Sequence, residues 1–149
     1  MEIPTMNRII FTLTLFLLIS FPLSQPTFTE HVISTSADNA MSVYAIDVDV
    51  DGDMDVLSAS SNDDKIAWYE NDVSESFTEH VISTSADDAT SVYAADVDGD
   101  GNMDVLSASR WDDKIAWYEN DGSEGFTEHA ISTSADDATS VYAADVDGD

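Results

Sequence analysis

Residues 77–125 read FTEHVISTSADDATSVYAADVDGDGNMDVLSASRWDDKIAWYENDGSEG. Nearly the same sequence precedes them in residues 28–76, and a truncated copy follows in residues 126–149. The copies start at residues 28, 77 and 126, so the period is 49 residues without an insertion. A repeat of this length is typical of β-propeller blades, solenoids and other arrays.

Each complete copy contains four segments that are typical of β-strands, which are SVYAADV, MDVLSAS, KIAWYEN and FTEHVIS in the second copy. They are short and contain β-branched or aromatic residues. Turn-forming residues separate these segments. No segment shows helical periodicity over a length that would form a helix. Four antiparallel strands in about 50 residues correspond to the blade of a β-propeller.

We therefore predict an all-β fold of four-stranded antiparallel sheets, in which SVYAADV is the innermost strand of each blade. One complete blade would span about residues 42–83 and a second about residues 91–132. The segment at residues 28–34 would be the outer strand of another blade, and residues 140–146 the inner strand of another. The sequence thus predicts a partial propeller of two complete blades and two partial ones.

A closed propeller needs at least four blades, and the sequence stops inside a motif at Asp149. We expect a fragment of a longer protein or a truncated gene model. The alternative is that several copies of the chain assemble into one ring, since repeat units need neighbours to bury their core. The predicted partners therefore include either the remaining blades of a longer protein or other copies of this chain.

The charge of the chain limits its partners. Its 149 residues include 31 acidic and 4 basic side chains, which gives a formal net charge of −27. Nucleic acid and anionic lipid would be repelled by such a chain, whereas cations would be attracted. Hydrophobic residues make up 43% of the sequence, which argues against the disorder that is common in very acidic chains. There is no cysteine, so no disulfide framework exists.

The N-terminal segment has the pattern of an export signal. Arg8 precedes an apolar run over residues 9–21, which is too short to span a bilayer comfortably. We predict a cleaved signal peptide over residues 1–24, with an uncleaved N-terminal anchor as the alternative. No other segment would span a membrane, so the mature protein is expected outside the cell or on its surface.

An acidic loop follows the innermost predicted strand of each copy. Its sequences are DVDVDGDMD at residues 47–55, DVDGDGNMD at residues 96–104, and DVDGD at residues 145–149. In both complete loops Asp stands at positions one, three, five and nine, and Gly stands at position six, where a tight turn needs positive φ. Alternate residues of a wrapped loop point inward, so this spacing brings oxygen atoms together.

Clustered carboxylates of this kind are typical of a calcium site, because Ca²⁺ takes about six to eight oxygen ligands. A bound cation would also remove the repulsion between them. Mg²⁺ is less suitable because it prefers a small, rigid octahedral site with retained waters. Zinc is unlikely because the sequence has no His or Cys at ligand spacing. An EF-hand loop is excluded because Ser58 and Ser107 stand where its Glu is required, and strand sequence follows. An acidic hairpin turn without an ion is the remaining alternative.

The segments DVDGDGNMDVLSAS and KIAWYENDG resemble the VCBS/FG-GAP repeat family, the calcium-binding blades of propellers like those of integrin α-subunits. The resemblance covers residues 28–149 and implies a Ca²⁺ loop between the first two strands of each blade. Two features depart from the family, since no Phe-Gly pair occurs and Val50 replaces Gly99 of the second copy. The implied ligands are Asp47, Asp49, Asp51, Asp53, Asp55, Asp96, Asp98, Asp100, Asn102, Asp104, and, in the third copy, Asp145, Asp147 and Asp149.

Other conspicuous residues favour structural roles. His31, His80 and His129 recur with the period, whereas a catalytic histidine would be unique. The Trp-Tyr pairs of the KIAWYEN segments are expected to place one ring between blades. Trp111 occurs in one copy only, at a predicted hairpin tip, and is either a contact for a sugar or protein partner or an incidental surface residue.

No sequence motif of a hydrolase, metalloprotease or phosphate-binding loop occurs. We therefore predict a secreted, calcium-binding structural or adhesion-type binding module, not an enzyme, whose partner is an extracellular protein or glycan. The alternative is a part, catalytic or not, of an extracellular polysaccharide-degrading enzyme. The step from fold to function rests on analogy.

Overall fold

The computed structural model describes residues 25–72, 74 and 76–148. The predicted signal peptide over residues 1–24 lies outside the described residues. His31–Asp149 forms one compact unit, separate from Met1–Glu30, and the account below concerns this unit.

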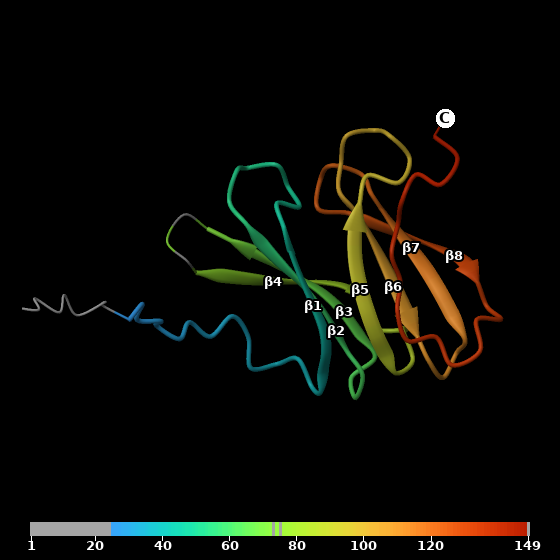
Figure 1. Ribbon diagram of the computed structural model, residues 1–149, viewed down its shortest axis with the longest axis horizontal. Coiled ribbons are helices and arrows are strands. Elements are labelled where there is room, and N and C mark those ends of the chain that lie inside the picture. The colour runs from blue at the N-terminus through green and yellow to red at the C-terminus, as the bar shows by residue number, and fades with distance from the viewer. Residues whose placement is uncertain (1–24, 73, 75, 149) are drawn as a thin grey trace, which may run out of the picture. The chain divides into compact units, whose positions relative to one another are not determined.

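Two antiparallel sheets of four strands make up the unit, and each follows the order of its strands in the sequence (Figure 1). No helix occurs in the described ranges, so the all-β prediction is confirmed. The first sheet contains β1 (Ala40–Ile46), β2 (Asp55–Ser60), β3 (Lys65–Asn71) and β4 (Phe77–Ser83). The second contains β5 (Ala89–Ala95), β6 (Asp104–Ser109), β7 (Lys114–Asn120) and β8 (Phe126–Ser132).

The two sheets have the same strand register. Val43 of β1 lies opposite Ser58, and its repeat equivalent Val92 of β5 lies opposite Ser107. The pairing shifts by one residue in both sheets, between Ala40 and Ser42 in the first and at the equivalent place in the second. Because the registers agree, equivalent residues of the two sheets are directly comparable.

A hydrophobic core joins the sheets. It contains Leu57, Ile66 and Trp68 of the first sheet together with Val92 and Tyr118 of the second. Trp68 and Tyr118 are fully buried, so each Trp-Tyr pair does supply a ring to the core. The hydroxyl groups of Tyr69 and Tyr118 lie 3.3 Å from the hydroxyls of Ser58 and Ser107, which gives these buried polar groups a partner.

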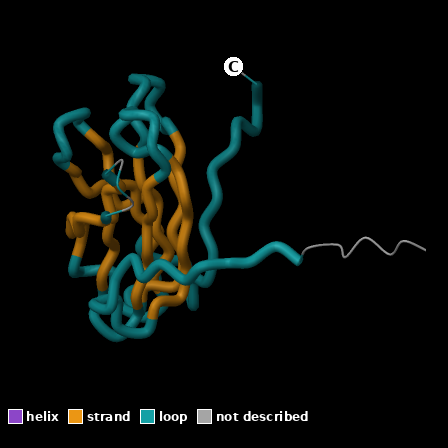
Figure 2. The backbone as a smooth tube through the Cα atoms, turned by 90° about the vertical axis from the view of Figure 1, so that its left-hand side faces the viewer, coloured by secondary structure: helices purple, strands orange, loops and turns teal. Residues whose placement is uncertain are grey.

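The two partial blades differ from the prediction, since neither residues 28–34 nor residues 140–146 form a strand. A strand needs a hydrogen-bonded neighbour, and the partial copies lack the adjoining MDVLSAS and KIAWYEN segments. Residues 140–146 still lie along β5, where the ring of Tyr142 packs at a tilt against that of Tyr93, with ring centroids 4.6 Å apart. Figure 2 shows this segment as a loop beside the strands.

No helix in the described part of the chain has the length and hydropathy needed to cross a membrane.

Candidate metal centre

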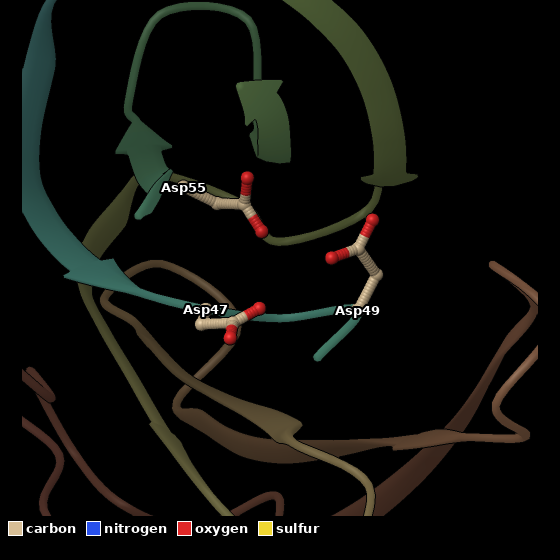
Figure 3. A group of neighbouring side chains, drawn as sticks. All are labelled: Asp47, Asp49 and Asp55. Carbon is tan, nitrogen blue, oxygen red and sulfur yellow. The ribbon is translucent and has the colours of Figure 1, made fainter. Parts of the chain in front are cut away.

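The acidic loops connect β1 to β2 and β5 to β6, and each brings three carboxylates together. In the first loop one oxygen each of Asp47, Asp49 and Asp55 lies within 4.8 Å of the others. These carboxylates face a common space between the loop and the start of β2 (Figure 3). The second loop arranges Asp96, Asp98 and Asp104 in the same way. The repeat therefore produces two equivalent acidic groups from positions one, three and nine.

The carboxylate at position one holds the backbone of its own loop. Asp47 accepts hydrogen bonds from the N–H groups of Asp51 and Gly52, both at 3.1 Å. Asp96 accepts them from Gly99 at 2.8 Å and Gly101 at 3.1 Å. These bonds wrap the loop around its acidic side chains.

The side chains at positions five and seven lie outside the groups of three. Asp51 instead accepts the N–H of Asp53 at 2.8 Å. Asp100 accepts both the N–H and the side-chain N–H of Asn102, each at 2.8 Å. Their assignment as ligands stays a prediction.

The aspartates of the third loop, at residues 145–149, do not form such a group among the described residues. Asp145 accepts the N–H of Gly148 at 2.6 Å, but Asp145 and Asp147 belong to no group of three among the described residues. Asp149 lies outside the described residues. A site in this loop likewise stays a prediction.

The carboxylate at position nine is completely buried and ties the loop to another strand. One oxygen of Asp55 accepts the N–H of Val48 at 2.9 Å, and the other accepts the N–H of Asn71 at 2.8 Å. Asp104 repeats this arrangement with Val97 and Asn120. Since an oxygen has a second lone pair, a cation could share the same carboxylate.

The asparagine that ends β3 or β7 is a residue whose role sequence reasoning missed. The side-chain N–H of Asn71 donates to the carbonyl of Met54 at 3.2 Å, and Asn120 donates to Met103 at 3.1 Å. Each asparagine therefore holds the start of the neighbouring strand, β2 or β6, and this is where the carboxylate at position nine lies. Its recurrence in both WYEN segments was the available signal.

The glycine at position six has the backbone conformation expected from the sequence. Its φ is 99° at Gly52 and 96° at Gly101. Val50 has a φ of 63° where Gly99 has 80°, so the first loop places a β-branched residue in a region that such residues rarely adopt. The first loop thus follows the same backbone path as the second, with backbone strain at Val50.

Repulsion between neighbouring carboxylates acts at position three. Burial raises the pKa of Asp49, and the charges of Asp47, Asp51 and Asp55 raise it further, against a hydrogen bond from the Asp51 N–H. For Asp98 the hydrogen bond from Asp100 lowers the pKa, but burial and the nearby acidic charges outweigh it. A cation beside these groups would reverse the unfavourable interaction.

The donor set fits a hard cation. Each group supplies only carboxylate oxygens, and neither contains a histidine or cysteine. Oxygen-only groups of this type suit Ca²⁺ or Mg²⁺ rather than zinc. The residues present could therefore hold a metal ion.

The histidines of the two sheets have structural contacts. His80 stacks on Trp68 with ring centroids 4.5 Å apart, and its Nε2 lies 2.8 Å from a carboxylate oxygen of Glu70. His129 repeats both contacts with Trp117 and Glu119. This agrees with the structural reading of these two residues.

Trp111 is exposed in the turn between β6 and β7, as expected for a hairpin tip. Its neighbour Arg110 forms ion pairs with Asp88 and Asp137, at 3.2 Å and 3.1 Å. Arg110 is therefore engaged within the chain.

Two lysines also have a role that the sequence did not reveal. Lys65 Nζ lies 2.8 Å from Glu79 and 3.2 Å from Asp63, and it donates to the carbonyl of Ser36 at 3.1 Å. Lys114 repeats these contacts with Glu128, Asp112 and Ser85. Each lysine thereby attaches the segment before a sheet to that sheet's second turn and outer strand.

Comparison with known families gave two matches to the model described as FG-GAP-like repeat, over residues 47–107 and 96–149. Each match begins at the first aspartate of an acidic loop, and together they extend over residues 47–149. Searches of curated proteins and of solved structures found no match.

Proposed function

Since the chain belongs to the FG-GAP-like repeat family, we propose that it is a secreted calcium-binding module of the β-propeller type, which binds an extracellular protein or glycan. The observation that supports this most strongly is the pair of equivalent carboxylate groups. A single acidic loop is weak evidence for an ion, but two loops in register with the repeat are much stronger.

In the proposed sites Asp47, Asp49 and Asp55 hold one calcium ion, and the equivalent residues Asp96, Asp98 and Asp104 hold the second. A bound ion would neutralise the carboxylates and contribute its binding free energy to the folded state. The three carboxylates come from both ends of the loop between the two innermost strands. Binding would therefore stabilise the connection between those strands.

The propeller arrangement is supported by the way successive copies meet. The first strand of the second sheet packs on the first sheet, and both sheets contribute to one core. Residues 140–146 meet β5 in the manner in which β5 meets β1. Repetition of the same contact between neighbouring units is how propeller blades are joined.

A binding role is preferred to catalysis. FG-GAP-like repeats suggest a propeller-type binding module. The repeated histidines and lysines of the two sheets have structural partners, as described above. Adhesion to an extracellular partner is therefore the role we propose, because it agrees with the family and requires no catalytic residue.

Isothermal titration calorimetry with CaCl₂ tests the metal sites. We expect two ions per chain, and one fewer after either Asp49→Ala or Asp98→Ala. Asp136→Ala is the matched control, because Asp136 is exposed, outside the acidic loops, and its loss changes the net charge equally. Heat of binding that is absent in the unaltered chain, or equal in all four proteins, would contradict the proposal.

A further inference from the structure

The acidic loops differ at position four, which is Val50 in the first loop, Gly99 in the second and Gly148 in the third. All three residues have a left-handed backbone, with φ of 63°, 80° and 77°. Glycine adopts this conformation without strain, whereas the branched Cβ of valine clashes with the backbone there. The loop path therefore suits glycine, and the first loop follows it with a residue that disfavours it.

The N–H group at position four has different roles in these loops. In the second loop Gly99 N–H donates to Asp96 Oδ1 at 2.8 Å, and Gly148 N–H donates at 2.6 Å to the equivalent oxygen of the third loop. In the first loop Asp47 Oδ1 instead accepts the N–H of position five, Asp51, at 3.1 Å. Valine at position four therefore accompanies a different hydrogen bond to the first carboxylate of the loop.

The first loop consequently has fewer N–H groups to orient its carboxylates. Asp51 N–H is shared between Asp47 at 3.1 Å and Asp49 at 3.2 Å. In the second loop two separate N–H groups serve these positions, since Gly99 donates to position one at 2.8 Å and Asp100 to position three at 3.1 Å. A carboxylate that is already held in place loses less freedom when a ligand binds. The second loop is therefore better organised for an ion.

We propose that the two calcium sites of this chain differ in affinity, that the second loop fills first, and that Val50 is the cause. This inference rests on the calcium sites of the proposed function. A bound ion holds the loop in its wrapped form, whereas a loop without an ion can relax the strain at Val50, which lowers the population that is ready to bind. We expect the dissociation constant to be about tenfold larger for the first loop, because strain at one residue commonly has this effect.

The charge at position seven acts in the opposite direction. Asp53 gives the first loop a negative charge that Asn102 does not give the second. Both side chains lie outside the groups of three carboxylates and are partly exposed. Water and salt screen the attraction between such a charge and an ion. The extra charge should therefore not outweigh strain in the backbone of the loop itself.

The first site adjoins a cavity between the two sheets. This cavity, of about 340 Å³, is lined by Asp49 of the first loop and by Asn102, Ser123 and Glu124 of the second sheet, among other residues. The carboxylates of Asp49 and Glu124 make it acidic in the absence of calcium. An ion in the first loop would neutralise Asp49. The charge of the cavity would then change over the calcium concentrations that fill the first site, after the second site is occupied.

Isothermal titration calorimetry of chains with one intact site tests the proposal. Asp98→Ala leaves the first site intact, and Asp49→Ala leaves the second. We expect the dissociation constant for CaCl₂ to be about tenfold larger in the Asp98→Ala chain. Adding Val50→Gly to that chain should remove most of the difference. Adding Gly99→Val to the Asp49→Ala chain should weaken its site by a similar factor.

Three further variants of the Asp98→Ala chain separate strain from charge. Val50→Gly together with Asp53→Asn gives the first loop the sequence of the second at every position, so its affinity should match that of the second. Asp53→Asn alone should weaken the first site slightly, because it removes a negative charge. Val50→Ile is the matched control, since it keeps the branched Cβ and should bind like the unaltered first loop.

Urea unfolding in EDTA shows which state carries the strain. The inference is overturned if Val50→Gly raises stability in EDTA without changing calcium affinity, because the strain would then be the same with and without the ion. Equal affinities of the two chains with one intact site would also overturn it, while leaving the calcium sites in place. Absence of calcium binding in both chains would overturn the proposed function together with this inference.

Discussion

The carboxylate at position nine of the acidic loops has two roles at the scale of single residues. Asp55 accepts backbone N–H groups from Val48 and Asn71 on its two oxygens, and it also belongs to the candidate metal group. Asp49, in contrast, accepts one N–H from its own loop and is exposed. The two aspartates are therefore expected to respond differently to substitution in the absence of metal.

Asp55→Asn should destabilise the protein even in EDTA. The amide group replaces one acceptor oxygen by a donor, which leaves a buried backbone N–H unsatisfied at a cost of about 1–3 kcal/mol. Asp49→Asn should have little effect in EDTA, because the removed charge also relieves repulsion within the loop. Urea unfolding in EDTA measures both changes. Equal losses for the two variants would show that Asp55 has no separate structural role.

At the scale of strands and turns, the contacts of Lys65 and Lys114 join separate elements of each sheet. Burial lowers the pKa of Lys65, but hydrogen bonds and attraction from Glu79 and Asp63 outweigh it, so the pKa is raised. The pKa of Glu79 is lowered, chiefly by its hydrogen bond from Lys65. Both shifts have the direction expected of a charged pair, which joins Lys65 at the start of β3 to Glu79 on β4.

Lys65→Met should lower the free energy of unfolding at pH 7 by about 1 kcal/mol, the size of a partly exposed ion pair with added hydrogen bonds. Because the pKa of Glu79 is below its ordinary 4.5 when folded, its contribution is present above that value and is lost as pH falls further. The difference between the two proteins should therefore shrink in acid. Urea unfolding at pH 7 and at pH 3 measures it.

Arg110→Met is the control for the lysine substitution. Arg110 pairs with Asp88 and Asp137 but is more exposed than Lys65, so its loss should cost less. A difference between Lys65→Met and the unaltered chain that is the same at both pH values would contradict the assignment to this pair.

The sequence predicted the strands well where all four of a sheet are present. Periodic turn residues and β-branched segments placed the sheets at about residues 42–83 and 91–132, and they run from Ala40 to Ser83 and from Ala89 to Ser132. The segments at residues 28–34 and 140–146 were wrongly predicted as strands. Their sequences match those of true strands, but strand formation depends on a paired neighbour and not on the segment alone.

The candidate sites were predictable in part. The carboxylates at positions one, three and nine lie together in both loops, and alternation along the loop is consistent with this. Alternation could not show that the carboxylate at position five accepts the N–H of position seven, or that Asn102 also donates its side-chain N–H to Asp100. The contacts of Asn71 and Lys65 join residues 16 and 14 positions apart in the sequence, and only the folded sheet reveals such pairs.

At the scale of the whole molecule, one repeat accounts for the sheets, the acidic groups and the interfaces between copies. The same repeat positions supply the carboxylates of both loops and the inner-strand contacts that link one copy to the next. The net charge of −27 makes compact folding costly without counter-ions. A protein of this composition should therefore depend on bound cations for part of its stability.

The melting temperature in the presence and absence of calcium tests this account most directly. If Ca²⁺ binds both loops, a concentration 100 times the dissociation constant adds about 2.7 kcal/mol per site. This corresponds to an increase on the order of 10 °C per site for a domain of this size. We predict that millimolar CaCl₂ raises the melting temperature relative to EDTA and that Asp49→Ala combined with Asp98→Ala removes most of the increase. An equal melting temperature of the unaltered chain in CaCl₂ and in EDTA would contradict the account.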